Sequence, residues 1–378
     1  MIKTKIFDKF ICLADKCEMT CCTGWSIRVE QQDMEKWQAS EETAYLCKET
    51  IDGQMKLNQC KTCVLLDENG LCEIVKRHGD AALSKTCSEF PRKCNRIYEL
   101  TDTEEEKVLC EEYSLTGACP AVLQLIDKEE EHAKIVEIPA LLKQELEFTM
   151  PFPMEYRIRN MLIYFLQETD FELDEKLMLC FDFLHECLEC EWETEVDDCI
   201  DVYTDEENQE EHIQLYRDVP YKKQDAFYEL CQTFMDVTEF YKEEEMYRPY
   251  LEELFECVQQ ADVEGLIEDW QRFRDSFAKK DGFFTKVMVS EIFADCVSDD
   301  LENLIESFQS IVMEYVMTRV SLFFKSRLIN GDSNQWIIPY LSLYIRMIGH
   351  NVDGMAEYWE DNFDDPVLTK EYLYLLLR

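Results

Sequence analysis

The sequence predicts a mainly α-helical protein in which a cysteine-rich, metal-binding N-terminal domain precedes an all-helical domain. Glycine and proline are scarce, at 10 and 9 of 378 residues, and this scarcity favours helices. Of the 19 cysteines, 12 fall within the first 119 residues, which marks that part of the chain as different from the rest. A chain of this length suits two domains, which we place at residues 1–125 and 126–378.

Apolar residues recur at the spacing of an α-helix through the second part of the chain. Residues 156–168 and 172–191 show this pattern, which lets a helix bury one face. We therefore expect residues 154–378 to be almost entirely helical, without a sheet of three or more strands. Further helices are expected over residues 222–242, 247–259, 263–278, 285–308, 310–328, 335–349 and 367–377.

Four polar segments are expected to interrupt these elements. The acidic stretch 101–108 is typical of a surface loop or hairpin, and residues 128–137 are typical of a charged connector. Residues 193–213 are strongly acidic and are expected to form a solvated loop. The Asn-Gly-Asp sequence at 330–332 predicts a turn between two helices.

The formal net charge of −43 is unevenly distributed. Residues 1–100 carry 15 Lys+Arg against 16 Asp+Glu, a net of −1, so residues 101–378 carry −42. Such an acidic region repels nucleic acid and anionic membranes and attracts a partner that bears lysines or arginines. Acidity also maintains solubility without any partner.

The N-terminus shows no secretory signal, and no stretch of the sequence approaches the ~20 apolar residues of a membrane span. We therefore expect a cytoplasmic protein, in which thiols stay reduced. Clustered cysteines in that compartment favour metal binding or catalysis over a disulfide framework.

Two groups of cysteines lie at the close spacings of metal ligands. Thiolates are the ligands that zinc and iron–sulfur clusters prefer, usually four to a centre. Because little chain separates them, gathering them around a metal costs little entropy. The groups are Cys12, Cys17, Cys21 and Cys22, and then Cys60, Cys63, Cys72 and Cys87.

The adjacent pair Cys21 and Cys22 carries further information. If the backbone is extended there, the two side chains point to opposite sides and serve two centres more easily than one. Gly24 can provide the backbone freedom for a sharp bend after the pair. Trp25 can shield the site from water, or it can be an ordinary core residue.

Residues 12–27 (CLADKCEMTCCTGWSI) and 63–92 resemble the opening of the flagellin lysine-N-methylase family, within a wider group of zinc- or iron-chelating cysteine-cluster proteins. Residues 114–120 (SLTGACP) resemble a further element of that family. The resemblance covers residues 10–120 and is loose beyond them, and Cys60, Cys94 and Cys110 lie outside its pattern. It implies eight metal ligands, enough for two four-ligand centres: Cys12, Cys17, Cys21, Cys22, Cys63, Cys72, Cys87 and Cys119.

The resemblance also implies methylation of lysine side chains on flagellin. It implies S-adenosylmethionine as donor, with a cysteine-ligated iron–sulfur cluster, or alternatively zinc, as the second cofactor. The sequence does not identify catalytic or donor-binding residues. No two glycines flank a single residue, as they do in the Gly-rich turn of common donor folds. The order Cys17-x3-Cys21-Cys22 also departs from the Cys-x3-Cys-x2-Cys of radical donor sites, so any donor site is expected to be unconventional.

Other candidates offer fewer ligands or partners. His185, Cys187 and Cys190 are too few to hold a metal alone and are expected to pack in the core. His78 lies between Cys72 and Cys87 and is the best candidate among the histidines for a role near the metal, or else an ordinary surface histidine. Arg92 can neutralise an anionic cluster, meet the donor's carboxylate or serve at a helix end.

Two other kinds of function fit the same residues. One is a non-catalytic, metal-stapled binding protein whose acidic half docks a basic partner. The other is an electron-transfer or metal-handling protein.

Overall fold

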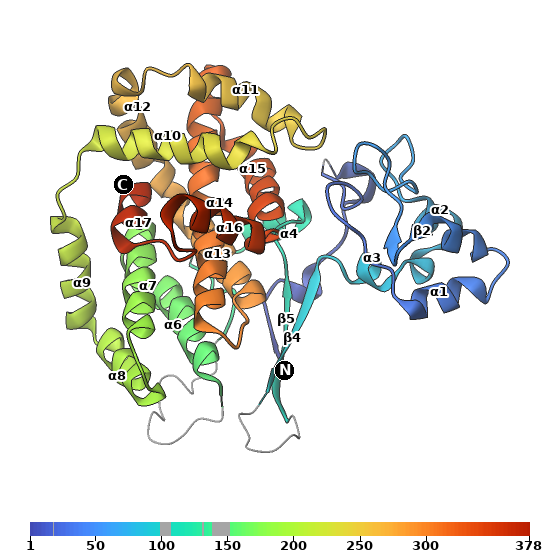
Figure 1. Ribbon diagram of the computed structural model, residues 1–378, viewed down its shortest axis with the longest axis horizontal. Helices are drawn as coiled ribbons and strands as arrows, with labels where there is room; N and C mark the ends of the chain where they lie inside the picture. The colour runs from blue at the N-terminus through green and yellow to red at the C-terminus, as the bar shows by residue number, and fades with distance from the viewer. Residues whose placement is uncertain (18, 99–106, 131, 138–151) are drawn as a thin grey trace.

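The computed structural model describes residues 1–378 except 18, 99–106, 131 and 138–151 (Figure 1). A large helical body lies beside a smaller lobe, residues 20–90, which we call the cysteine lobe (Figure 1). Each part has its own hydrophobic core. The mainly helical class predicted from the sequence is confirmed, whereas the division at residue 125 stays a prediction.

The described strands all lie before residue 116. In the larger sheet, β5 (Val108–Leu115) lies between β1 (Ile2–Lys3), to which it is parallel, and β4 (Arg92–Tyr98), to which it is antiparallel. β2 (Thr50–Ile51) and β3 (Gln54–Met55) form a separate small hairpin. Residues 99–106, which hold most of the surface loop or hairpin predicted at 101–108, lie outside the described part of the chain. The three-stranded sheet itself was not predicted.

Three short helices belong to the cysteine lobe: α1 (Gln31–Gln38), α2 (Glu73–His78) and α3 (Lys85–Glu89). A π-helical segment, Ile345–Gly349, directly follows the helix that ends at Tyr344. The helices of the body are α4 (Pro120–Asp127), α6 (Met154–Glu168), α7 (Leu173–Leu188), α8 (Glu193–Thr204), α9 (Glu206–Asp218), α10 (Lys223–Glu239), α11 (Arg248–Gln259), α12 (Val263–Phe277), α13 (Asp281–Asp295), α14 (Leu301–Leu328), α15 (Ile337–Tyr344), α16 (Val352–Phe363) and α17 (Lys370–Leu377).

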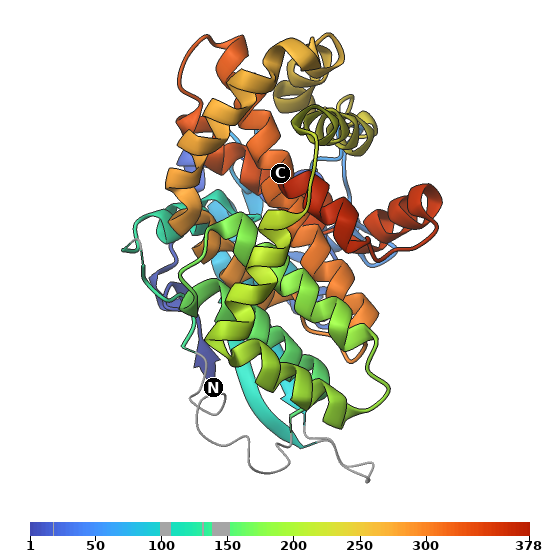
Figure 2. The same cartoon turned by 90° about the vertical axis from the view of Figure 1, so that its left-hand side faces the viewer.

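α14 forms the centre of the body, and α13 packs beside it (Figure 2). α14 is 28 residues long and is buried on all sides from Phe308 to Lys325, which is typical of a helix surrounded by others. α13 also contacts β5 and α4, so the same helix joins the body to the sheet. The absence of a larger sheet after residue 154, as predicted, holds for every described residue.

The sheet is fixed to the body by a buried ion pair. Glu112 on β5 and Arg159 on α6 form two hydrogen bonds of 2.8 Å each, and both side chains are 1% exposed. Two parallel bonds of this kind fix orientation as well as distance. Among the described helices, none combines the length and apolar composition of a membrane-crossing segment.

The prediction of a solvated loop over residues 193–213 is wrong. That segment forms α8 and most of α9, because Val196, Ile200 and Ile213 point inward at helical spacing and are buried. Asp205 begins α9 by accepting hydrogen bonds of 3.0 Å from the amides of Glu207 and Asn208. The acidic residues occupy the outer faces of these two helices.

The helix break predicted at residue 309 is also wrong, since α14 passes through it without interruption. The break lies instead at residues 296–300, where Asp300 accepts a hydrogen bond of 3.0 Å from the Asn303 amide and caps α14. α16 was not predicted. The turn predicted at 330–332 is confirmed, with Asn330 in the left-handed region at φ +48°.

Candidate metal centre and an adjoining acidic cavity

Four of the predicted ligands interact where the N-terminal loop meets the start of α4. Burial, together with the charges of Cys17 and Cys12, raises the pKa of Cys119 to about 11. Burial likewise raises the pKa of Cys17, with added contributions from Cys12 and Cys21. Because such charge interactions weaken with distance, these sulfurs lie near one another. We call Cys12, Cys17, Cys21 and Cys119 the junction thiols.

The other four predicted ligands lie in or against the core of the cysteine lobe. They are Cys22, Cys63, Cys72 and Cys87, which we call the inner thiols. The Cys63 amide donates to the Cys22 carbonyl at 2.8 Å. Burial raises the pKa of Cys87, and the charges of Cys21, Cys72 and Cys63 add to this effect. The resulting pKa is about 12. The inner thiols therefore form a second neighbourhood.

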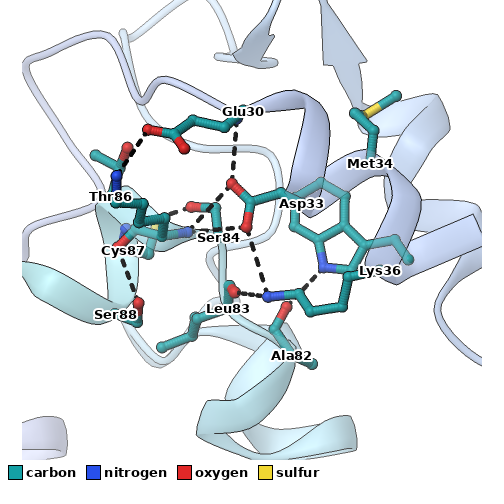
Figure 3. Close-up of polar contacts among 12 residues, drawn as sticks. Glu30, Asp33, Met34, Lys36, Ala82, Leu83, Ser84, Thr86, Cys87 and Ser88 are labelled. Carbon is teal, nitrogen blue, oxygen red and sulfur yellow. Dashed lines mark hydrogen bonds and ion pairs between the residues drawn. The ribbon is translucent and has the colours of Figure 1, made fainter.

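Polar contacts fix the segment that carries Cys87 against α1 (Figure 3). Ser84 caps α3 by accepting a hydrogen bond of 3.3 Å from the Cys87 amide. The buried carboxylate of Asp33 accepts from the Lys85 amide at 3.0 Å. Trp37 donates to the Ala82 carbonyl at 2.7 Å. These contacts hold an inner thiol at a defined place in the lobe.

Cys21 and Cys22 lie in a turn, so the extended backbone that would point their side chains apart is absent. A hydrogen bond between the two thiols raises the pKa of Cys21. Cys21 also interacts with the junction thiol Cys17 and with the inner thiols Cys63 and Cys87. The pair therefore stands between the two sets of thiols.

The two sets have the chemistry of a metal site, because thiolates in fours suit zinc and iron–sulfur clusters. A bound cation would also offset the burial that raises their pKa values. Within the described residues, no three His, Cys, Asp or Glu side chains are close enough together to hold a metal ion. The assignment of the eight cysteines as ligands stays a prediction.

Arg346 lies against the junction thiols from the side of the helical body. It is 4% exposed and belongs to the π-helical segment. Its guanidinium donates to the carbonyls of Met19 at 2.9 Å, Thr20 at 3.0 Å and Ala118 at 2.9 Å. Burial lowers the pKa of Arg346, and Tyr247 and the junction thiols oppose that effect. The cation thus faces thiols and carbonyls.

Arg92, in contrast, lies away from the thiols. It is exposed on β4, with its guanidinium 5.0 Å from the centre of the Phe10 ring. Of the two arginines, Arg346 is the one whose charge acts on Cys17. The roles suggested for Arg92 by the sequence stay predictions.

A cavity of about 70 Å³ lies between α13, α14 and the π-helical segment. Two of its lining residues are Glu291 and Glu314, which are 1% and 2% exposed. Glu291 accepts hydrogen bonds from the Gly117 amide at 2.7 Å and from the Thr116 hydroxyl at 3.3 Å. The Gly349 amide donates to Glu314.

Both glutamates have raised pKa values. Burial and, to a smaller extent, the charge of Asp295 raise the pKa of Glu291 to about 8. Burial also raises the pKa of Glu314 well above its usual range, with further contributions from Glu291 and Asp295. Lys93, the nearby cation, forms its ion pair with Asp295 instead. The cavity therefore contains two carboxyl groups without a cationic partner among the described ion pairs.

Trp25 and His350 connect the cavity to the thiols. His350 lines the cavity, and its ring centre is 5.2 Å from that of Trp25. Trp25 donates from Nε1 to the Cys21 carbonyl at 3.0 Å, and the Arg346 guanidinium is 4.7 Å from its ring centre. Gly24 has φ +95°, and a Cβ there would lie 2.3 Å from the Met246 sulfur, so the bend before Trp25 requires glycine.

The model of the FliB lysine N-methylase C-terminal domain matches residues 159–376, more than half of the chain. The chain belongs to this family. The lysine-N-methylase of Salmonella choleraesuis (strain SC-B67) is 30% identical to it over 164 residues, 40% of this chain and 38% of that protein. That of Salmonella typhimurium (strain LT2) is 29% identical over 165 residues, with the same coverage.

The flagellar biosynthetic protein FliU of Salmonella muenchen is 33% identical over 129 residues, which are 31% of this chain and 70% of that protein. The matches to the two lysine-N-methylases span 38% of the length of each. No solved structure matches the chain. The FliB domain contains Arg346, Glu291 and Glu314, whereas the eight predicted ligands precede residue 159.

The other candidates suggested by the sequence have local partners. His78 hydrogen-bonds the Tyr45 hydroxyl through Nε2 at 3.2 Å. His185 contacts the Leu368 carbonyl at 3.1 Å, and Cys187 is 1% exposed, in agreement with the core packing expected for them. Three cysteines outside the resemblance also interact elsewhere: Cys60 with Glu245, Cys94 with Tyr113, and Cys110 with Glu112.

Sequence reasoning missed Arg346, Glu291 and Glu314. Each is a single charged residue inside an apolar stretch: YIRMIG, VMVSEIFA and IVMEYV. Charged residues are almost never fully buried unless they have a partner or a role. The signal that would have found them is therefore a charge on the inward face of a predicted core helix.

Proposed function

We propose that this FliB-family protein methylates lysine side chains of flagellin, with S-adenosylmethionine as methyl donor and a cysteine-ligated iron–sulfur or zinc centre as cofactor. Two relatives are named lysine-N-methylase and a third is a flagellar biosynthetic protein, which supports this activity and substrate. The observation that carries the proposal is the region where the loop with the junction thiols packs on the helical body. There, thiols, a buried arginine and two buried glutamates meet within the FliB domain and the loop packed on it.

Methyl transfer places definite demands on the site. In its polar form, a neutral lysine amine forms a bond to the methyl carbon while the bond from that carbon to the sulfonium sulfur breaks. The electron pair of the broken bond stays on sulfur, and the lysine nitrogen loses a proton. A site for this reaction must remove that proton and must exclude water, and the buried carboxyl groups of the cavity that His350 lines, next to Trp25, suit both demands.

The eight thiols are the residues that would hold the metal. The junction thiols face Arg346, and the inner thiols lie in the lobe core. When bound, an iron–sulfur cluster supplies electron-transfer chemistry, whereas zinc supplies positive charge and a structural staple. Arg346 lowers the net negative charge that four thiolates bring to the junction. We place the reaction in the cytoplasm, where these thiols stay reduced.

The acidic region is proposed to attract a lysine-bearing surface of flagellin. Charge attraction mainly raises the rate of encounter and is screened beyond ~8–10 Å at physiological salt. Association with flagellin is therefore expected to slow markedly between ~50 and ~300 mM salt, while the dissociation rate changes little. Stopped-flow or surface-plasmon measurements over this range test the expectation. An association rate that does not depend on salt would show that charge attraction does not bring flagellin to the protein.

Mass spectrometry of flagellin tests the proposed activity. Flagellin from cells that express the protein should carry methylated lysines, and flagellin from cells without the gene should not. Unmodified lysines in both would overturn the proposal and would favour a non-catalytic, metal-stapled binding protein for a basic partner.

A further inference from the structure

The cavity between α13 and α14 contains two buried carboxyl groups without a matching cation among the described residues. Glu291 and Glu314 line it, and neither forms an ion pair with a described lysine, arginine or histidine. The charged or titratable neighbours are Asp295 on α13, Lys93 on β4 and His350, which follows the π-helical segment. Because Lys93 pairs with Asp295, the two glutamates have no cation of their own.

One hydroxyl that lines the cavity has no hydrogen-bond partner among the described residues. Ser310 on α14 is 2% exposed and lines the cavity, and its hydroxyl forms no hydrogen bond to any other described residue. This hydroxyl is therefore available to a molecule in the cavity. Glu314 is equally buried. Its carboxylate lies so close to the backbone of Gly349 that a Cβ there would be 2.4 Å from Oε1, so only glycine fits at this position. The chain thus holds this carboxylate at the cavity wall.

The remaining lining suits an alkyl chain that ends in a cation. Ile311 and Ile345 form apolar walls, while the two carboxylates and Ser310 supply acceptors. A volume of about 70 Å³ accommodates the last carbons and the nitrogen of a lysine side chain, since a water molecule occupies roughly 30 Å³. A divalent metal is a poorer fit, because no three ligand side chains among the described residues converge there.

We propose that this cavity is the receptor for the substrate's lysine side chain, with Glu291 and Glu314 accepting hydrogen bonds from its ammonium group. The assignment rests on the proposed function, which supplies lysine as the substrate. Its location fits, because Trp25 and His350 separate the cavity from the junction thiols by one layer of side chains. The two glutamates bind the reacting nitrogen and are candidates for the group that takes its proton.

Proton exchange in the cavity gives this assignment a pH dependence. In the free protein, Glu291 has a pKa of about 8, so it carries a proton at neutral pH. An ammonium group favours the carboxylate form and lowers that pKa, so binding releases a proton. Affinity for an alkylammonium should therefore rise as pH increases toward about 8 and level off above it, because the ammonium itself stays charged to about pH 10.

Kinetics on flagellin with the metal-loaded full-length protein test the assignment. Glu314→Gln and Glu291→Gln keep the side-chain shape and remove the charge, so each should raise the KM for flagellin by about tenfold to a hundredfold. Metal content should not change. Glu302→Gln, at an exposed position on the same helix, is the matched control and should behave as the wild type. Unchanged KM and kcat in both cavity variants, with flagellin still methylated, would overturn the inference and leave the proposed function intact.

A binding measurement keeps the test independent of turnover and of the variants' folding. n-Butylammonium, which mimics the end of a lysine side chain, should bind the wild-type protein in calorimetry more tightly than 1-butanol does. Its affinity should rise from pH 6 to about pH 8. Equal binding of the two compounds, or binding that is insensitive to pH, would show that the cavity is not an ammonium receptor.

Discussion

Cys22→Ser is expected to remove much of the bound metal and to leave most of the protein insoluble. The core of the cysteine lobe contains few large buried side chains, and four of the residues in or against it are inner thiols. A bound metal can contribute on the order of 10 kcal/mol to the folding of so small a unit. The loss of one metal ligand is therefore expected to cost more than the whole free energy of unfolding of such a small lobe.

Cys47→Ser is the matched control for this experiment. Cys47 packs against the same small core but is not among the eight predicted ligands. Its thiol contacts the Met34 carbonyl at 3.6 Å. The control should keep its metal and stay soluble, as measured by metal analysis of the soluble fraction. Full metal content in the Cys22→Ser protein would show that the inner thiols do not form a metal site.

Arg346→Met is the second substitution with a large expected effect. It would remove three hydrogen bonds, and the Thr20 carbonyl would lose its side-chain donor, while the Ser342 hydroxyl still donates to the Ala118 carbonyl. A buried acceptor without a partner costs about 1–3 kcal/mol, so the free energy of unfolding should fall by about that amount. The loop that carries the junction thiols should lose its anchor on the helical body, and metal content should fall with it.

Two further variants separate charge from packing at this position. Arg346→Lys keeps the cation but cannot make all three hydrogen bonds, so it should restore metal content better than it restores stability. Arg92→Met changes an exposed arginine and should alter neither quantity. If Arg346→Met lowers stability while metal content stays full, the arginine acts as a structural link alone.

The sequence predicted the helical part of the fold well because its signals are local. Helical spacing of apolar residues located most of the body, including α7, α10 and α12. The errors arose where composition concealed the pattern. In α8 and α9 the acidic outer face outweighed the buried Val196 and Ile213, and in α14 the buried residues lie on nearly all sides of the helix, so its apolar residues gave no clear period to mark its length.

The site was predictable only in part, because its components come from distant parts of the chain. Local spacing and the resemblance led to Cys12, Cys17, Cys21 and Cys22. Arg346 lies more than 300 residues away in the sequence from the loop that it contacts. The spacing of residues along the sequence does not reveal such a contact. The pairing of Glu291 with Glu314 depends likewise on how α13 packs against α14.

Flagellin methylation in cells that carry the Cys119→Ser protein tests the central claim most directly. Cys119 is a buried junction thiol at the start of α4, so its loss should affect the centre next to Arg346 and the acidic cavity. Cells with the wild-type or Cys47→Ser protein should yield flagellin with methylated lysines in mass spectrometry. Cells with soluble Cys119→Ser protein should yield unmodified flagellin. Equal methylation in all three would contradict a thiol-held centre at the site of lysine methylation.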